Sequence, residues 1–177
     1  MAQSAFIVKV PGVESLVGRL RERFDATSGL GVPAHITVLF PFMDPADITA
    51  DVLQRAGRAL ERINAFSFTL DSVGRFPSTA YLAPNPCEPF IAMTRAIADA
   101  FPGFEPHGGE HRDVVPHLTA AHGNRAEADA AEEELRRRLD EVARTVQPCD
   151  SVSLIENSTG RWQEFYAFQL SSSGGAT

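Results

Sequence analysis

The sequence has little lysine, little cysteine and no long apolar run. Lys9 is the only lysine among 16 basic residues, and 23 acidic residues bring the formal net charge of the 177-residue chain to −7. An acidic chain does not coat nucleic acid, because non-specific binding of that kind comes from neutralised phosphates. The two cysteines, Cys87 and Cys149, have no metal-binding spacing, and we expect reduced thiols. No apolar stretch approaches the ~20 residues of a membrane-spanning helix.

The first residues show no targeting segment, and the composition is that of a globular protein. Met1–Pro11 has no basic region followed by an apolar run, so we expect no signal peptide and a cytoplasmic location. The chain is 44% hydrophobic and 22% charged, and it is long enough to bury a core. We predict a monomer with one domain over residues 1–170, followed by a flexible tail over residues 171–177.

Apolar periodicity predicts an alternation of strands and helices. Strands are expected at Ala5–Val10, His35–Phe40, Ala65–Val73, Thr79–Ala83, Val114–Ala121, Ser151–Ile155 and Trp162–Leu170. Helices are expected at Val13–Phe24, Ile48–Ile63, Glu88–Phe101 and Arg125–Val146. Glycine and proline predict a turn at Gly74–Ser78, a strand end at Pro84–Pro86 and an exposed loop at Pro102–Asp113. We interpret that loop as a flexible cover.

The predicted elements form an internal repeat. A helix, a strand that begins His-x-Thr, a helix, a strand, a turn and a strand occur twice in the same order. His35 and His117 are 117 − 35 = 82 positions apart, and the tripeptide Asp-Ser-Val recurs after 150 − 71 = 79 positions. The sequence therefore predicts an α+β fold with a duplicated, pseudo-twofold architecture. In it, two sheets face a central cleft and the helices lie outside.

The two His-x-Thr strands carry the residues best suited to chemistry. Side chains two positions apart share a strand face, so His35 lies beside Thr37, and His117 lies beside Thr119. A twofold brings two imidazoles and two hydroxyls to one cleft. This set of side chains suits the cleavage of a phosphodiester. A neutral histidine can accept a proton from the attacking water, and a protonated histidine can donate a proton to the ribose oxygen that leaves the phosphorus. Threonine hydroxyls can hydrogen-bond the phosphate oxygens of the transition state, and none of these steps requires a metal or another cofactor.

Two segments resemble the signature motifs of a known family. They are Pro33–Phe42, with the sequence PAHITVLFPF, and Val115–Thr119, with the sequence VPHLT. They resemble the paired motifs of the 2H phosphoesterases, and most closely those of bacterial 2′-5′ RNA ligase-like proteins and their 2′,3′-cyclic phosphodiesterase relatives. The resemblance extends from Ala5 to Leu170. It implies a bilobal fold, catalytic roles for both histidines and phosphate binding by both threonines.

Phe76, Arg75 and Arg161 are further candidates for substrate contacts. Phe76 lies where the resembled family often has an aromatic residue near the nucleobase, and a core phenylalanine is the alternative interpretation. Arg75 and Arg161 occupy the two repeat-related turns, where either can reach a phosphate or remain a solvated surface residue. Tyr81 and Trp162 are interpreted as packing residues.

The remaining histidines are interpreted as non-catalytic. His122 follows His117 at an odd spacing, which places it on the opposite strand face, and the resembled family more usually has a basic residue there. His107 and His111 lie close by in sequence, which invites a zinc site. Gly108–Gly109 argues against a helix that presents both of them, and we predict no metal.

These observations predict a metal-independent phosphoesterase that hydrolyses a 2′,3′-cyclic phosphate of RNA or of a nucleotide. The reverse reaction would form a 2′-5′ linkage. The two histidines act as general acid and base, and the regiochemistry decides which is which. Two alternatives stay open: a non-catalytic nucleotide- or RNA-end-binding module that uses the same cleft, and a metal-dependent hydrolase that uses the histidine-rich loop.

Overall fold

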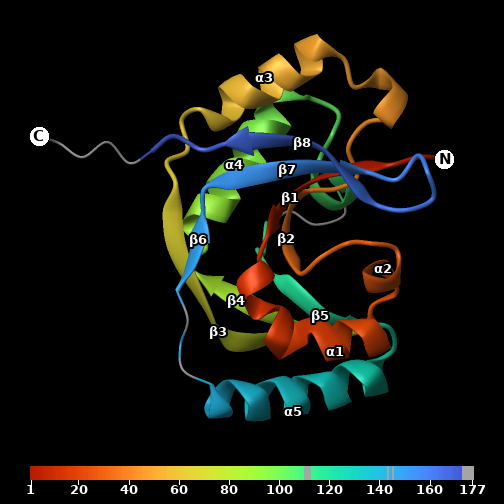
Figure 1. The fold of residues 1–177 in the computed structure, drawn as a ribbon, viewed down its shortest axis with the longest axis vertical. Coiled ribbons are helices and arrows are strands. Elements are labelled where there is room, and N and C mark those ends of the chain that lie inside the picture. Colours follow the sequence, from red (N-terminus) through yellow and green to blue (C-terminus); the bar gives the residue numbers. More distant parts are fainter. Residues whose placement is uncertain (110–112, 143, 145, 173–177) are drawn as a thin grey trace, which may run out of the picture.

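The residues described by the structure form one curled antiparallel sheet of eight strands, with helices packed against it (Figure 1). The computed structural model describes residues 1–109, 113–142, 144 and 146–172. The strand order is β6-β3-β4-β5-β2-β1-β7-β8. The strands are β1 (Ser4–Lys9), β2 (His35–Leu39), β3 (Phe66–Phe76), β4 (Thr79–Asn85), β5 (Leu118–His122), β6 (Gln147–Cys149), β7 (Ser151–Glu156) and β8 (Gln163–Gln169).

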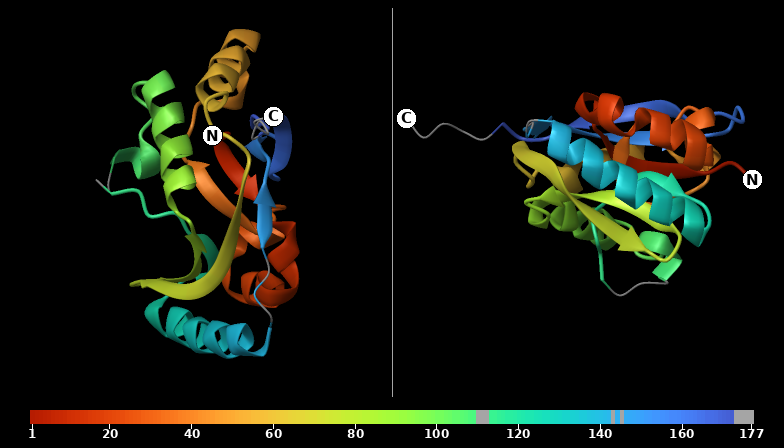
Figure 2. Two further views of the ribbon diagram at one scale, coloured as in Figure 1. Left: turned by 90° about the vertical axis from the view of Figure 1, so that its left-hand side faces the viewer. Right: turned by 90° about the horizontal axis from the view of Figure 1, so that it is seen from below.

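The helices gather at two ends of the molecule, α3 and α4 at one and α1 and α5 at the other (Figure 2). The α-helices are α1 (Glu14–Phe24), α2 (Ala26–Gly29), α3 (Ala50–Leu60), α4 (Glu88–Ala100) and α5 (Arg125–Glu141). Short 3-10 helices are η1 (Pro11–Val13), η2 (Pro45–Asp47) and η3 (Pro106–Gly109). Within the described residues, none of these helices has the length and apolar character needed to cross a membrane.

The sheet reproduces the internal repeat of the sequence. The first repeat runs β1-α1-β2-α3-β3 and the second runs β4-α4-β5-α5-β7. The third strand of each repeat crosses to the other half, because β3 pairs with β4 and β7 pairs with β1. Helices cross as well: α1 packs against β5, and α4 packs against β2. The predicted α+β class is thus confirmed. Because each repeat lends a strand and a helix to the other, the two repeats share one sheet and one core.

The two halves meet where β2 lies beside β5. Ile36 pairs with Leu118 in antiparallel orientation, and this contact joins the two predicted sheets into one continuous curled sheet. Both side chains are fully buried. The His-x-Thr segments of the two repeats are therefore direct neighbours at the centre of the molecule.

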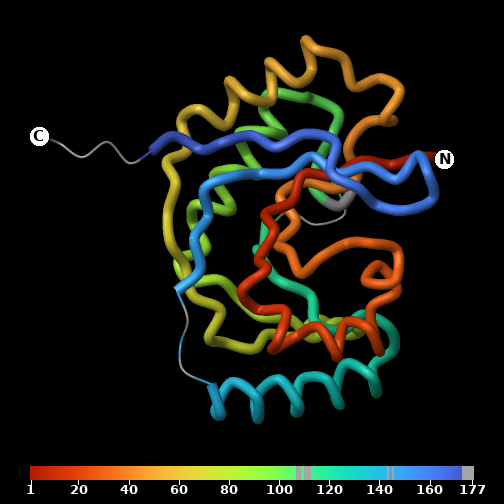
Figure 3. The backbone as a smooth tube through the Cα atoms, viewed as in Figure 1, coloured from red at the N-terminus to blue at the C-terminus, as the bar shows by residue number. Residues whose placement is uncertain are grey.

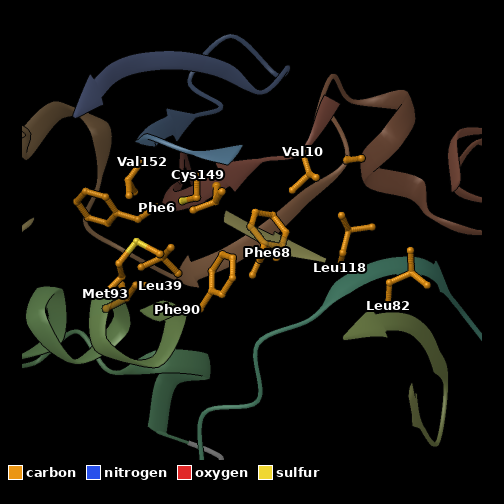
Figure 4. Close-up of a cluster of buried hydrophobic side chains, with 14 of the residues drawn as sticks. Phe6, Val10, Leu39, Phe68, Leu82, Phe90, Met93, Leu118, Cys149 and Val152 are labelled. Atoms are coloured by element: carbon orange, nitrogen blue, oxygen red, sulfur yellow. The ribbon is translucent and has the colours of Figure 1, made fainter. Parts of the chain in front are cut away.

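One hydrophobic cluster unites side chains from both halves (Figure 4). Phe68 and Phe90 pack edge to face, with ring centroids 5.0 Å apart, and both are at most 2% exposed. Phe6 packs in the same way on Phe42, at 4.8 Å. Aromatic pairs of this geometry add about 0.5–1.5 kcal/mol beyond the area that they bury. Ile36 of β2 and Leu118 of β5 belong to the same cluster, so packing in the core holds both strands in place.

Two predicted strand ends lie further along the chain than expected. The predicted turn at Gly74–Ser78 is confined to Pro77 and Ser78, because Phe76 still pairs with Thr79. Strand β4 also continues through Pro84, where the predicted breaker begins. A register shift in the β3–β4 pairing lies at this proline, and such an irregularity accommodates a residue without an N–H group.

Three other boundaries also differ. Helix α5 ends at Glu141, and Val142 and Val146, predicted on its buried stripe, are 50% and 65% exposed. β-Branched residues at this end favour the extended backbone seen at Val142. Strand β5 begins at Leu118 rather than at residue 114. Ser171 of the predicted tail is hydrogen-bonded to residues 61 and 63, and residues 173–177 of that tail lie outside the described residues.

Candidate active site

The four side chains of the two His-x-Thr segments lie next to one another at the β2–β5 junction. In antiparallel pairing, Ile36 opposite Leu118 places His35 across from Thr119 and His117 across from Thr37. All four side chains are half-buried, whereas their neighbours Ile36 and Leu118 face the core. We call these four residues the H-x-T cluster, and the sheet face that carries them the H-x-T face. Neighbouring strands lie about 4.8 Å apart, which is close enough for one small anion to contact both pairs.

Each imidazole of the H-x-T cluster is held by the carbonyl of the residue two positions before it. His35 Nδ1 lies 2.8 Å from the Pro33 carbonyl oxygen, and His117 Nδ1 lies 2.7 Å from that of Val115. A carbonyl can only accept, so both Nδ1 atoms carry the proton of this hydrogen bond. Nε2 is then the nitrogen of each ring that exchanges protons with a ligand.

The surroundings of His35 favour its neutral form. Burial lowers the pKa of His35 from 6.5 to about 4, and the hydrogen bond to Pro33 opposes this shift. The cation of Arg21 and the charge of His117 lower the pKa further, while Asp25 raises it. That His117 lowers the pKa of His35 is consistent with the two imidazoles lying close together in the H-x-T cluster. At neutral pH, Nε2 of His35 is therefore an unprotonated base.

A β-bulge follows each His-x-Thr segment. In β2, the pairing with β1 shifts after Thr37, so Val38 and Leu39 both turn into the core opposite Phe6. The next residue, Phe40, then packs with the small apolar cluster that contains Ile7, the partner of Thr37 in β1. A bulge shifts the alternation of side chains by one position, and it turns Phe40 toward the H-x-T face.

The bulge in β5 corrects the predicted orientation of His122. Pairing with β4 shifts after Thr119, so Ala120 and Ala121 are both fully buried. His122 then pairs with Thr79, and the Thr79 hydroxyl lies 2.8 Å from His122 Nδ1. His122 therefore lies on the H-x-T face, not on the opposite face. Odd spacing predicts opposite faces only in a regular strand, and no signal in the sequence marks this bulge.

Two aromatic rings surround His117. Phe76, from the end of β3, meets the imidazole edge to face at 5.1 Å between ring centroids, and Tyr81 lies at 5.2 Å. The two aromatic rings also contact each other at 4.6 Å. The structure thus places Phe76 beside the H-x-T cluster, as a packing partner of His117. Tyr81, interpreted from the sequence as a packing residue, contacts the same imidazole.

Gly74 is required for this arrangement. It pairs with Tyr81, whose ring covers the glycine: a Cβ at residue 74 would lie only 2.2 Å from the ring carbon Cε2. We predict that Gly74→Ala displaces the Tyr81 ring and lowers the free energy of unfolding by about 1–3 kcal/mol. Urea denaturation measures this loss. Gly57→Ala is the control, because its Cβ would meet only Phe168 at 3.9 Å, and it should be neutral or stabilising. Equal losses in both variants would contradict the steric explanation.

The two candidate arginines are engaged away from the H-x-T cluster. Arg75 forms ion pairs with Asp129 and with Glu132 of α5, the latter at 3.4 Å between Nε and the carboxylate. It therefore faces the helix, on the side of β3 opposite to its neighbour Phe76. Arg161 donates a hydrogen bond of 3.2 Å to the Gly29 carbonyl, at the end of α2. Each guanidinium thus has a structural partner here, and a phosphate contact by either stays a prediction.

A charged pair on the H-x-T face was missed by sequence reasoning. Lys9 pairs with His35 across β1 and β2, and its ammonium forms an ion pair with Glu164 of β8. Glu164 also accepts a hydrogen bond of 2.7 Å from the Ser153 hydroxyl. Alternation along β1 indicates which way the side chain of Lys9 points. Only the pairing of β1 with β2 shows that Lys9 lies next to His35.

The metal interpretation has no support among the described residues, which contain no group of three His, Cys, Asp or Glu side chains that could hold an ion. The side chain of His107 and the whole of His111 lie outside the described residues. The covering role predicted for the loop at 102–113 falls partly on residues 110–112, which also lie outside them.

Comparisons with known proteins agree with this architecture. Residues 10–161 match the family model of the 2′-5′ RNA ligase superfamily. The fold is similar to E. coli LigT complexed with NADP+, with 16% identity, a TM-score of 0.58 and coverage of 96% of this chain and 98% of LigT. It is similar to TT0787 of Thermus thermophilus, with 16% identity, a TM-score of 0.58 and coverage of 97% and 100%. LigT has also been solved with 3′-AMP, at 15% identity, a TM-score of 0.57 and coverage of 95% and 97%. No curated protein matches the chain.

Proposed function

This chain belongs to the 2′-5′ RNA ligase superfamily, and we propose that it hydrolyses 2′,3′-cyclic phosphates on nucleotides or at RNA ends. The observation that carries the proposal is the H-x-T cluster, in which two imidazoles are held identically through Nδ1 and alternate with two hydroxyls. Such a pair supplies a base and an acid to one phosphate, and two hydroxyls bind its oxygens. The complexes of LigT with 3′-AMP and NADP+ support a ligand of nucleotide size.

In the proposed reaction His35 is the base and His117 is the acid. His35 Nε2 removes a proton from water while the water oxygen forms a bond to phosphorus. The bond from phosphorus to one ribose oxygen breaks, and His117 Nε2 donates a proton to that oxygen. The products are a ribose monophosphate and a free hydroxyl. The low pKa of His35 supports this assignment, because an imidazole that is neutral at pH 7 is ready to accept a proton.

The substrate is expected to be small. With a net charge of −7, the chain has no excess of cations to follow a long phosphate backbone. The H-x-T face instead offers the rings of Phe76 and Tyr81 beside His117. These groups suit one nucleoside next to one phosphate. A 5′-hydroxyl in place of water would follow the same steps: its oxygen bonds to phosphorus, the bond to the 3′-oxygen breaks, and a 2′-5′ linkage remains.

The proposal is tested by turnover of four 2′,3′-cyclic nucleotides and of short RNAs with cyclic ends, measured both with and without a chelator. We expect monophosphate to appear, and its isomer shows which ribose oxygen leaves. A linear 3′,5′-diester of the same nucleoside serves as the control substrate and should not react. Activity that a chelator abolishes, or nucleotide binding without turnover, would contradict the proposal.

We also predict that each threonine contributes through its hydroxyl. Thr37→Val and Thr119→Val keep the side-chain shape but remove a donor to a charged oxygen, a bond of about 1.5–3 kcal/mol, so kcat falls roughly 10- to 100-fold. Thr→Ser at either position restores the donor and most of the activity. Steady-state kinetics on the best cyclic nucleotide measure both changes. Valine variants as active as the wild type would remove the threonines from the site.

A further inference from the structure

A buried ionic network lies behind His35, in the segment that leads from α1 to β2. Figure 3 shows this segment, residues 25–34, between the two elements. Arg21 is only 2% exposed, and its Nη2 lies 3.1 Å from the carboxylate of Asp25, which is 7% exposed. Charges this deep in a protein are costly unless they are paired and hydrogen-bonded. Apolar side chains at these positions could not hydrogen-bond the backbone, so we expect the network to act through the backbone groups that it binds.

The contacts of the network converge on the peptide units on either side of Pro33. Arg21 Nη2 donates a hydrogen bond of 2.9 Å to the Val32 carbonyl. Glu14 Oε1 accepts one of 2.6 Å from the Ala34 N–H and lies 4.0 Å from Arg21 Nη1. The Pro33 carbonyl between these two points is the acceptor for His35 Nδ1.

Other contacts hold the same segment from its remaining sides. The Ala34 carbonyl accepts a hydrogen bond of 2.8 Å from the Val10 N–H. Asp25 caps α2 by accepting from the Thr27 N–H at 3.0 Å. The N–H and the carbonyl of Ala34 are thus bonded to Glu14 of α1 and to Val10, the residue that follows β1. A carbonyl held this firmly fixes the tautomer and the orientation of the imidazole that it binds.

The same three residue types recur 74 positions later in α4, as 14 + 74 = 88, 21 + 74 = 95 and 25 + 74 = 99 give Glu88, Arg95 and Asp99. Arg95 and Asp99 line a cavity of about 340 Å³ together with Val114, in the segment that leads to His117. Arg95 and Asp99 are exposed, whereas Arg21 and Asp25 are buried, so the spacing recurs in α4 without a buried network.

We propose that Arg21 is a positioning residue that acts through the Val32 and Pro33 carbonyls and, with Glu14 and Asp25, holds His35 Nε2 toward the phosphate. The proposal rests on the proposed function for its kinetic consequences. Its geometric part concerns the ring of His35 alone. Arg21 touches no substrate, and its effect is on where the base points and on which nitrogen carries the proton.

The test uses the double variant Arg21→Met/Asp25→Asn, which removes both charges together and leaves no buried carboxylate unpaired. We expect kcat to fall about 100-fold with KM little changed, because a displacement of about 1 Å at a reacting group has that effect. Glu14→Ala, at a residue whose side chain is 44% exposed, should fold normally and lose activity to a smaller extent. Arg21→Lys keeps the charge without the planar fork and should recover only part of the rate.

Two controls separate positioning from a general loss of stability. Val17→Ala truncates a fully buried residue of the same helix and should leave kcat unchanged below its unfolding temperature. Arg95→Met removes the repeat-related arginine and should leave His35 unchanged. The groups that face His35 are Arg21 and Asp25 from the α1–α2 segment, Lys9 from β1 and His117 beside β5. Arg21 lowers and Asp25 raises the pKa of His35, so Arg21→Met alone should raise that pKa and move the acid limb of the kcat/KM profile to higher pH, whereas Arg95→Met should not.

Nitrogen NMR of the His35 ring gives a readout that does not depend on turnover. We expect one tautomer, protonated at Nδ1, in the wild type and in Val17→Ala, and a mixture of tautomers in the Arg21 and Glu14 variants. A folded Arg21→Met/Asp25→Asn protein with the wild-type tautomer would overturn the positioning role, whatever the activity. If the tautomers change as expected but no cyclic phosphate is hydrolysed by the wild type, the positioning role stands and the proposed function fails.

Discussion

Replacing either histidine of the H-x-T cluster by alanine is expected to lower kcat by roughly 10²- to 10⁴-fold, the range typical of a lost general acid or base. KM should change little, because the threonine hydroxyls and the neighbouring rings still hold the substrate. Each imidazole is held through Nδ1 by its own carbonyl, so neither ring can take the place of the other without turning. Single-turnover kinetics on a 2′,3′-cyclic nucleotide separate this loss in the chemical step from changes in binding.

His122→Ala is the matched control for these two variants. His122 lies on the same face, but its Nδ1 is engaged by the Thr79 hydroxyl and it stands outside the H-x-T cluster. We expect a change of less than about tenfold in kcat, whereas each of the two histidine variants, His35→Ala and His117→Ala, loses at least roughly 100-fold. The double variant His35→Ala/His117→Ala should be less impaired than the product of the single losses, since residues that act as a unit are not additive. A His122 variant as inactive as the cluster variants would mean that the acid–base pair has been assigned to the wrong histidines.

The sequence predicts the centre of this site better than its surroundings. The pair His35 and His117 is recognisable because two His-x-Thr strands occupy equivalent places in a repeat, and a twofold brings equivalent strands together. The face of Thr37 and Thr119 follows from strand alternation alone. These features depend on local pattern and symmetry, and both can be read along the chain.

The surroundings depend on pairing between distant segments, which a local pattern does not contain. His122 changes face because β5 has one more residue than β4 between two pairs, and Phe40 does so because β2 has one more than β1. The glycine and proline around Arg75 predict a turn there. Strand β3 instead continues to Phe76, and strand alternation then points Arg75 toward α5. The network around Arg21 is invisible for the same reason: its partners include two backbone groups more than ten positions away.

The activity is expected to persist in acid far below the usual range of a histidine base. Because burial lowers the pKa of His35 to about 4, half of the base is still unprotonated at pH 4. An imidazole with the ordinary pKa of about 6.5 would then be almost fully protonated, and kcat/KM would be roughly 150-fold lower. The cyclic phosphate keeps one negative charge over this range, so the acid limb of kcat/KM reports the free enzyme. The measurement is kcat/KM from pH 3.5 to 8 at constant ionic strength.

The same pKa makes a second prediction about stability. His35 binds its proton near pH 4 in the folded chain but near 6.5 in the unfolded chain, so the unfolded state takes up more protons between these values. The contribution of the neutral imidazole is therefore fully present above pH 6.5 and is lost as the pH falls through 4. His35→Gln, which cannot titrate, should lose less stability than the wild type between pH 7 and pH 4, as urea denaturation would show. An acid limb near 6.5 together with equal pH dependence of stability in the two proteins would mean that His35 is solvated like a surface residue, and the role of base would then pass to His117.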